Sequence, residues 1–162
     1  MNPAHFHLMV NHLPIIFPIV GAIVMTIGLI FASAAVQRTA FIIFVIGALT
    51  SITAMVSGEG AEDIVEKISG ISEQVIEHHE ETAERFSILT YILGVMSIFG
   101  LWSSIKEKTF TLMTNYIVLL FSLIVIYFGS ETGTSGGEIR HTEIRKNDSP
   151  LQESVNKSEE KE

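Results

Sequence analysis

The chain has 162 residues, of which 48% are hydrophobic, and it carries a formal net charge of −8. It contains no cysteine, which excludes disulfides, thiolate-bound zinc, iron–sulfur clusters and covalently attached c-type haem. The acidic balance also excludes a basic surface of the kind that binds nucleic acid. Because the hydrophobic residues are gathered in long runs with the charges between them, we expect one small membrane domain rather than an ordinary soluble one.

The first apolar run follows a short lead-in. Asn2 with a proline directly after it is typical of a helix start, so we expect a short helix over residues 5–12. Pro14 and Pro18 each remove one helical hydrogen bond, and we expect them to kink the helix without breaking it. Residues 14–35 are long enough to cross a hydrocarbon core of about 30 Å at roughly 1.5 Å per residue, and they form the first predicted span.

Three further apolar runs are long enough to cross the bilayer: residues 39–57, 86–103 and 110–129. We expect Gly58 and Gly60 to end the second span, and the apolar spacing over residues 61–68 predicts a short amphipathic helix on the membrane surface. Ser72 then caps a new helix that rises into the third span. The predicted fold class is therefore all-α: an integral membrane four-helix bundle with a short amphipathic surface helix between spans 2 and 3.

The chain divides into two predicted parts. Residues 1–146 form the four-span transmembrane domain, and residues 147–162, which are charged and lack aromatic side chains, form a disordered tail. Gly133, Gly136 and Gly137 are not followed by the Gly-Lys-Ser/Thr of a phosphate loop. We expect them instead to allow close backbone approach, so that the segment after the fourth span folds over the end of the bundle.

Four crossings place the N-terminus, the acidic segment between spans 2 and 3 and the C-terminal segment on one side of the bilayer. The two tight loops on the other side carry Arg38, Lys106 and Lys108, whereas residues 1–13 contain no Lys or Arg. The positive-inside rule therefore makes the loops cytoplasmic and both termini extracytoplasmic. Three basic residues beyond the fourth span favour the opposite orientation: Arg140, Arg145 and Lys146.

All six histidines fall at the predicted extracytoplasmic end of the bundle: His5, His7, His12, His78, His79 and His141. Imidazole is a common ligand for zinc, copper, iron and haem iron in proteins, and neighbouring carboxylates supply oxygen ligands or orient the imidazoles. This convergence predicts a histidine-centred site at that end.

Helical spacing separates these histidines. His79 shares a helix face with apolar residues and should point into the bundle, whereas His78 should point to water. On the first helix His12 shares a face with His5, and His7 is turned away from His12 by about 140° if the helix is regular. For His5 and His78 we expect only the role of solvated side chains at a membrane interface.

Four motifs occur in a fixed order: HLMVNHLP at residues 7–14, Gly58-Glu59 with Ala61-Glu62, the stretch from Gly70 to Glu81, and Gly136-Gly137-Glu138-Ile139. Together they resemble the uncharacterised bacterial four-span membrane-protein family known as domain of unknown function 2231. Members of this family are similar in layout to small membrane cytochromes, and some are joined to Rieske or cytochrome c domains. The resemblance implies redox work in the bacterial inner (cytoplasmic) membrane. It picks out three histidines and the glycine pair: His7, His12, His79, Gly136 and Gly137.

Three functions stay open at this point. In the first, two histidines from different helices, such as His12 and His79, hold a non-covalent haem b or a redox metal in an electron-transfer subunit. In the second, histidines and glutamates bind or handle a non-haem divalent metal, with Fe, Cu or Zn as candidates: His7, His12, His79, Glu62, Glu80 and His141. In the third, the chain is a structural subunit of a larger membrane complex and holds no cofactor.

The expected partners are the lipid bilayer and a redox protein or larger membrane complex, with no nucleic acid. The sequence contains no Ser–His–acid order and no nucleophile elbow, so hydrolase chemistry is not favoured. Whether the protein is an enzyme stays open.

Overall fold

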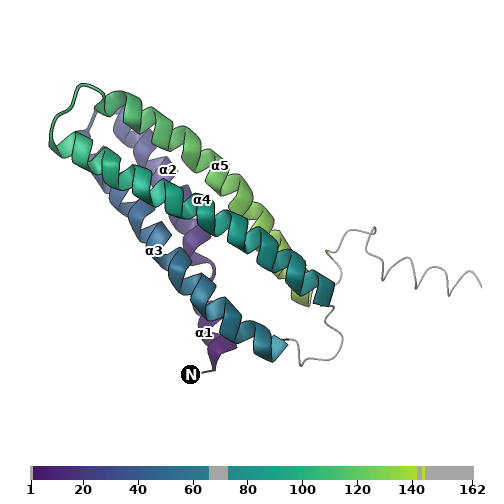
Figure 1. Cartoon of the computed structure of the whole chain (residues 1–162). Coiled ribbons are helices and arrows are strands. Elements are labelled where there is room, and N and C mark those ends of the chain that lie inside the picture. The colour runs from purple at the N-terminus through teal and green to yellow at the C-terminus, as the bar shows by residue number, and fades with distance from the viewer. Residues whose placement is uncertain (1, 66–72, 142–143, 145–162) are drawn as a thin grey trace, which may run out of the picture.

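The computed structural model describes residues 2–65, 73–141 and 144. The helices in that part of the chain are α1 (Pro3–Val10), α2 (Leu13–Ile30), α3 (Ala34–Val65), α4 (Glu73–Ile105) and α5 (Thr111–Arg140). Helices α2 to α5 lie antiparallel in one bundle, and α1 packs along the end of α3 (Figure 1). The predicted all-α four-helix bundle is therefore confirmed.

The outside of the bundle is apolar. Helices α3, α4 and α5 are each long and apolar enough to cross a membrane, and so is the segment that α1 and α2 form together. Ile30, Val95 and Leu120 expose 72%, 68% and 63% of their surface. A continuous apolar surface of this kind is unfavourable in water and matches the hydrocarbon core of a bilayer. The protein is thus a multi-pass membrane protein whose outer face contacts lipid.

The inside of the bundle has an apolar core that ends before the histidines. Each long helix packs on the next one in the chain, and α2 closes the ring against α5. Phe41 and Phe44 of α3 lie in this core with Met25 of α2 and Phe86 of α4. Because His79 is about two helical turns from Phe86 on the same helix, the histidine end lies beyond the apolar core.

Polar side chains tie the helices together at the tight-loop end. The guanidinium of Arg38 donates to Oγ of Ser104 at 3.0 Å and to the carbonyl of the same residue at 2.8 Å, which occupies a terminal carbonyl of α4. Gln37 donates to the carbonyl oxygen of Gly28 at 2.9 Å and accepts from Nδ2 of Asn115 at 2.7 Å. These bonds fix the spacing of α2, α3, α4 and α5.

The N-terminal lead-in is a separate helix. Asn2 caps it as predicted, since its Oδ1 accepts a hydrogen bond from a backbone N–H two residues on, at 2.9 Å. The helix ends at Val10, so the expected kink is a break, and the predicted helix over residues 5–12 begins and ends two residues too late. Pro14 gives the physical reason, because it has no N–H for the Val10 carbonyl and its ring would clash with that carbonyl. Pro18, by contrast, stays inside α2.

The glycines after the second predicted span do not end the helix. α3 continues through Gly58 and Gly60, so its last turns take the place of the separate surface helix that we expected. A Cβ at Gly60 would lie 3.2 Å from the Cβ of Pro3, so the glycine permits the close approach of α1. The remainder of the predicted surface helix, residues 66–68, lies outside the described residues.

The glycine-rich segment after the fourth predicted span is also helical. α5 runs through Gly133, Gly136 and Gly137, so the expectation that this segment folds over the bundle end is wrong. These glycines allow close packing between helices instead of a turn, since the backbone at Gly136 lies against a histidine of α4. The predicted tail, residues 147–162, lies outside the described residues.

Candidate histidine site

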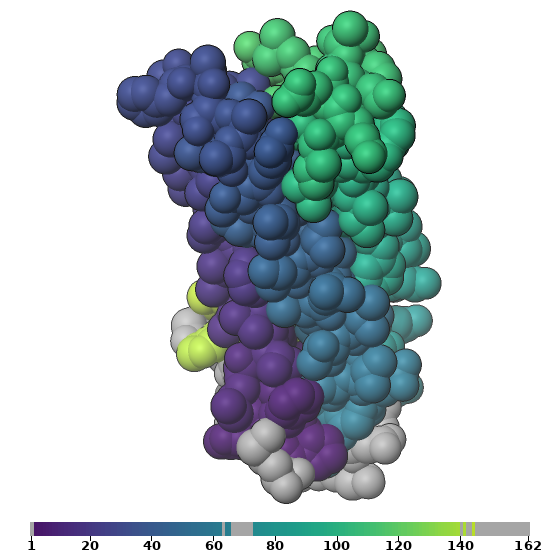
Figure 2. Space-filling view, turned by 90° about the vertical axis from the view of Figure 1, so that its left-hand side faces the viewer, coloured from purple at the N-terminus to yellow at the C-terminus, as the bar shows by residue number. Residues whose placement is uncertain are grey.

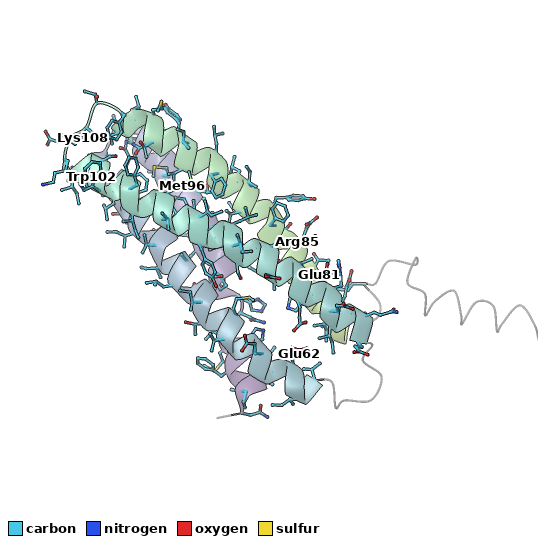
Figure 3. All side chains as sticks on the ribbon, in the orientation of Figure 1. Glu62, Glu81, Arg85, Met96, Trp102 and Lys108 are labelled. Carbon is cyan, nitrogen blue, oxygen red and sulfur yellow. The ribbon has the colours of Figure 1, made fainter. Side chains whose placement is uncertain are left out.

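Several chain segments lie at one end of the bundle: α1 beside the last turns of α3, and the first turns of α4 beside the last turns of α5 (Figure 1). Figure 2 shows α1, in purple, lying against the end of α3. Glu62 and Glu81 lie at this end, and Trp102 and Lys108 lie at the other (Figure 3). All six histidines stand on or directly beside these segments, as the even number of crossings predicts.

His7 joins α1 to α3. Its Nδ1 lies 3.1 Å from the carbonyl oxygen of Ala54 and 3.0 Å from Oγ of Ser57. The Ser57 hydroxyl in turn donates to the Ala54 carbonyl at 3.0 Å. A Cβ added at Gly58 would lie 3.4 Å from Cε1 of His7, so the ring lies against the glycine backbone. The imidazole is half-buried and held at one nitrogen.

His79 joins α4 to α5 in the same manner. Its Nδ1 lies 2.9 Å from Oγ of Ser135, and the Ser135 hydroxyl donates to the Thr132 carbonyl at 3.0 Å. The hydroxyl of Thr82 lies 2.8 Å from Oγ of Ser135 and 2.9 Å from the carbonyl oxygen of His79. A Cβ added at Gly136 would lie 3.0 Å from Cε1 of His79. His79 therefore points into the bundle, as its helical spacing predicts.

The environment of His7 favours a neutral ring. The residue precedes the first predicted span, residues 14–35. Burial lowers the pKa of His7 below its ordinary value of 6.5, the hydrogen bond to the Ala54 carbonyl opposes this, and the charge on His12 adds to it. A neutral imidazole keeps the nitrogen lone pair that metal ligation requires.

The environment of His79 has the same effect. The residue lies ahead of the third predicted span, residues 86–103, in the charged first turns of α4. Burial is the main cause that lowers the pKa of His79 below 6.5, and the charges on His7 and then His78 lower it further. A hydrogen bond to the Thr132 carbonyl opposes the shift. The charge on His7 therefore acts on the His79 ring although the two residues stand on different helices.

The remaining predicted ligands do not complete a metal site around this pair. His12, in the turn before α2, and Glu80, on α4, are exposed, Glu62 on α3 is half-buried, and His141 is exposed at the C-terminal cap of α5. Among the side chains that the structure describes, which do not include that of Asp63, no three His, Asp or Glu residues are placed to hold one ion. Two further histidines are exposed as predicted: His5 and His78.

Only one of the two predicted glycines lies against a histidine. Gly136 lies against His79, whereas a Cβ added at Gly137 would lie 3.1 Å from Cδ1 of Ile144. Gly136 is therefore the member of the pair that belongs to the histidine site.

The residues that hold the two rings were missed in the sequence. Ser57, Ser135 and Thr82 make the side-chain hydrogen bonds, and Asn11, one turn after His7, has a buried Oδ1 without a hydrogen-bond partner among the described residues. One signal could have revealed the two serines, because the pattern small residue, two residues, Ser, Gly occurs in both helices: Ala54 to Gly58 and Thr132 to Gly136.

Comparison of the chain with protein-family models, with curated proteins and with solved structures gives no match. The resemblance to the family known as domain of unknown function 2231 therefore stays a prediction.

Proposed function

We propose that this protein is an electron-transfer component of the bacterial inner membrane that holds haem b, or another redox-active metal group, between His7 and His79. The observation that carries the proposal is which ring nitrogen of His7 and of His79 forms hydrogen bonds to the protein. Each ring contacts the protein through Nδ1, and Nε2 makes no hydrogen bond to a described residue. Two half-buried imidazoles from different helices, each with its pKa lowered by burial, suit the protein ligands that a haem b of this type requires.

The choice of haem over a bare ion rests on the number of ligands. A non-haem divalent ion takes three or four protein ligands, whereas the porphyrin supplies four nitrogens and leaves two axial positions to the protein. A pair of histidines without a third His, Asp or Glu among the described residues suits a porphyrin-bound iron. Held by these two histidines, a haem group would supply one-electron transfer.

The pair that we propose differs from the pair expected from the sequence. His12 is exposed in the turn between α1 and α2, whereas His7 is half-buried against α3. The break at Val10 separates the two histidines onto different segments, so their angular relation in a regular helix no longer applies. His7 therefore replaces His12 as the proposed partner of His79.

The chain's own residues would do three things in such a site. They hold each ring in one orientation through Nδ1, keep the imidazoles neutral by burial, and present glycine backbone where a side chain would crowd the ring. We propose that the site faces the extracytoplasmic side and exchanges electrons with a redox protein or a larger membrane complex there.

The test uses the full chain purified in detergent from bacterial membranes. We expect a haem b absorption spectrum, or saturable uptake of added haemin at one per chain, with the spectrum of a low-spin haem bound by two imidazoles. Single replacements His7→Ala and His79→Ala should each abolish the low-spin spectrum, because one axial ligand is lost. His78→Ala is the matched control, since this neighbouring histidine is exposed.

A purified protein that shows no haem absorption and takes up no haemin would refute the haem proposal. Elemental analysis for iron, copper and zinc on the same sample then separates a non-haem metal site from a structural subunit that holds no cofactor.

A further inference from the structure

We infer that both imidazoles are held with the proton on Nδ1, which leaves the Nε2 lone pair to a ligand. The Ala54 carbonyl, with Ser57 beside it, sets this form in His7, and Ser135 is the positioning residue that sets it in His79. The inference rests on the proposed function because it concerns the same two histidines. It deepens that function by naming the class of occupant, which is a group that accepts a nitrogen lone pair.

Two similar cradles carry this inference. We use the word cradle for the carbonyl, serine and glycine that surround one ring: Ala54, Ser57 and Gly58 on α3, and Thr132, Ser135 and Gly136 on α5. In each cradle the serine hydroxyl donates to the carbonyl three residues earlier, at 3.0 Å. In each, Cε1 is the ring atom nearest to the glycine. The same local arrangement thus occurs twice, on helices that face different histidines.

The position of the proton on His7 follows from the acceptor. A carbonyl oxygen only accepts hydrogen bonds, so the 3.1 Å contact between Nδ1 and the Ala54 carbonyl requires a proton on Nδ1. Ser57 has one hydroxyl proton, which it gives to the same carbonyl, so its lone pair faces the Nδ1 proton. A neutral imidazole with its proton on Nδ1 has an unprotonated Nε2.

The hydroxyl network around His79 accommodates the same tautomer. Ser135 and Thr82 have two hydroxyl protons, and the 2.8 Å contact between their oxygens uses one of them. If His79 carries its proton on Nδ1, the Ser135 proton goes to the Thr132 carbonyl or to Oγ1 of Thr82. If Nδ1 has no proton, the Ser135 hydroxyl can donate to it instead. When the Ser135 hydroxyl donates to the Thr132 carbonyl, as the Ser57 hydroxyl donates to the Ala54 carbonyl, Nδ1 of His79 must be the donor to Oγ of Ser135, and we assign this arrangement by analogy with His7.

This tautomer determines what the site can bind. Both rings present a lone pair at Nε2 and no donor there, so a hydrogen-bond acceptor such as an anion is not favoured. A metal centre takes such lone pairs directly, and an imidazole that donates through its other nitrogen is oriented and made more basic.

The test begins with the full chain labelled with ¹⁵N-histidine, in detergent at a pH above 7 and without added ligand. Protonated and unprotonated imidazole nitrogens differ widely in ¹⁵N chemical shift, and His7→Gln and His79→Gln variants assign the two rings. We expect both to carry the proton on Nδ1. A proton on Nε2 in either ring of the unaltered protein would overturn the inference, whatever any variant does.

Serine variants separate positioning from mere packing. Ser135→Ala should convert His79 to a mixture of tautomers. Ser135→Thr, which keeps a hydroxyl, should retain the single tautomer with the proton on Nδ1. Ser57→Ala should leave the proton of His7 on Nδ1, because the Ala54 carbonyl remains. Ser130→Ala is the matched control, since this exposed serine of α5 makes the same bond to a carbonyl three residues earlier, at 2.8 Å, without a histidine.

Haemin titration of the same variants completes the test. We expect Ser135→Ala to weaken haemin binding about 10- to 100-fold, as loss of a group that orients a ligand typically does, with no change for Ser130→Ala. An unchanged His79 tautomer together with unchanged haemin affinity in Ser135→Ala would overturn the inference. If haemin does not bind the unaltered protein but both rings carry the proton on Nδ1, the haem proposal fails and the inference on the serines is supported.

Discussion

His79 of α4 lies near enough to His7 of α1 for a positive charge on His7 to lower the pKa of His79. The relation has a consequence for stability, because both rings have a pKa below the 6.5 of an unfolded chain. The unfolded chain therefore takes up these protons at a higher pH than the folded chain. The free energy of unfolding should be greatest above pH 6.5 and should fall as the pH drops from 6.5 to the lowered pKa values.

The measurement is the thermal unfolding temperature in detergent at pH 7.5 and at pH 5.5. We expect a larger loss at pH 5.5 for the unaltered protein than for the double variant His7→Gln, His79→Gln, which lacks both titrating groups. The carboxylates are the same in both proteins, so the comparison isolates the two rings. An equal loss in both proteins would show that the rings do not titrate with lowered pKa values.

Close contact between α3 and α4 gives a second prediction. A Cβ added at Gly94 would lie 2.6 Å from the Cβ of Ala48, and both atoms are fixed to helix backbones. Gly94→Ala should therefore force the helices apart and lower the free energy of unfolding by about 1–3 kcal/mol. Gly133→Ala is the control, because its Cβ would lie 3.6 Å from the flexible end of Ile15. That variant should be neutral or slightly stabilising, since alanine is the better helix former. Equal unfolding temperatures for the two variants would contradict the prediction.

The bundle could be predicted from the sequence because its cause is local. Four long apolar runs can satisfy their backbone groups in a bilayer only as helices, and the turns between them fix the antiparallel order. The orientation of His79 followed from helical spacing for the same reason, since α4 continues without a break from Glu73 to Ile105.

The histidine site could be predicted only in part because its details depend on tertiary contacts. A glycine ends a helix or admits a neighbour according to what lies beside it, and Gly58 and Gly136 each lie against an imidazole. The choice between His7 and His12 depended on where Pro14 ends the first helix. The hydroxyls that hold the rings come from helices far along the chain, and no local pattern pairs a serine with a distant histidine.

A buried amide and its half-buried partner at the tight-loop end give a third prediction. Asn115 is 1% exposed, and its Nδ2 donates to Oε1 of Gln37 at 2.7 Å. Gln37→Leu would leave that donor unpaired inside the bundle and should cost about 1–3 kcal/mol of unfolding free energy. Adding Asn115→Leu removes the unpaired amide, so the double variant should recover most of the loss. Thermal unfolding of the two single variants and the double variant measures the coupling. A double variant whose loss equals the sum of the single losses would show that the two amides are not coupled.

The last prediction concerns orientation in the membrane, which we propose from the basic residues of the tight loops: Arg38, Lys106 and Lys108. The chain has no cysteine, so a single introduced thiol reports on one position. Glu80 is exposed at the histidine end and Lys106 is exposed at the other end. In intact spheroplasts a membrane-impermeant maleimide should label Glu80→Cys and should label Lys106→Cys only after lysis. Labelling of both introduced cysteines after lysis is the control that each thiol can react with the maleimide. The reverse pattern in intact spheroplasts would place the histidines in the cytoplasm, and the electron partner of the site would then have to be sought on that side.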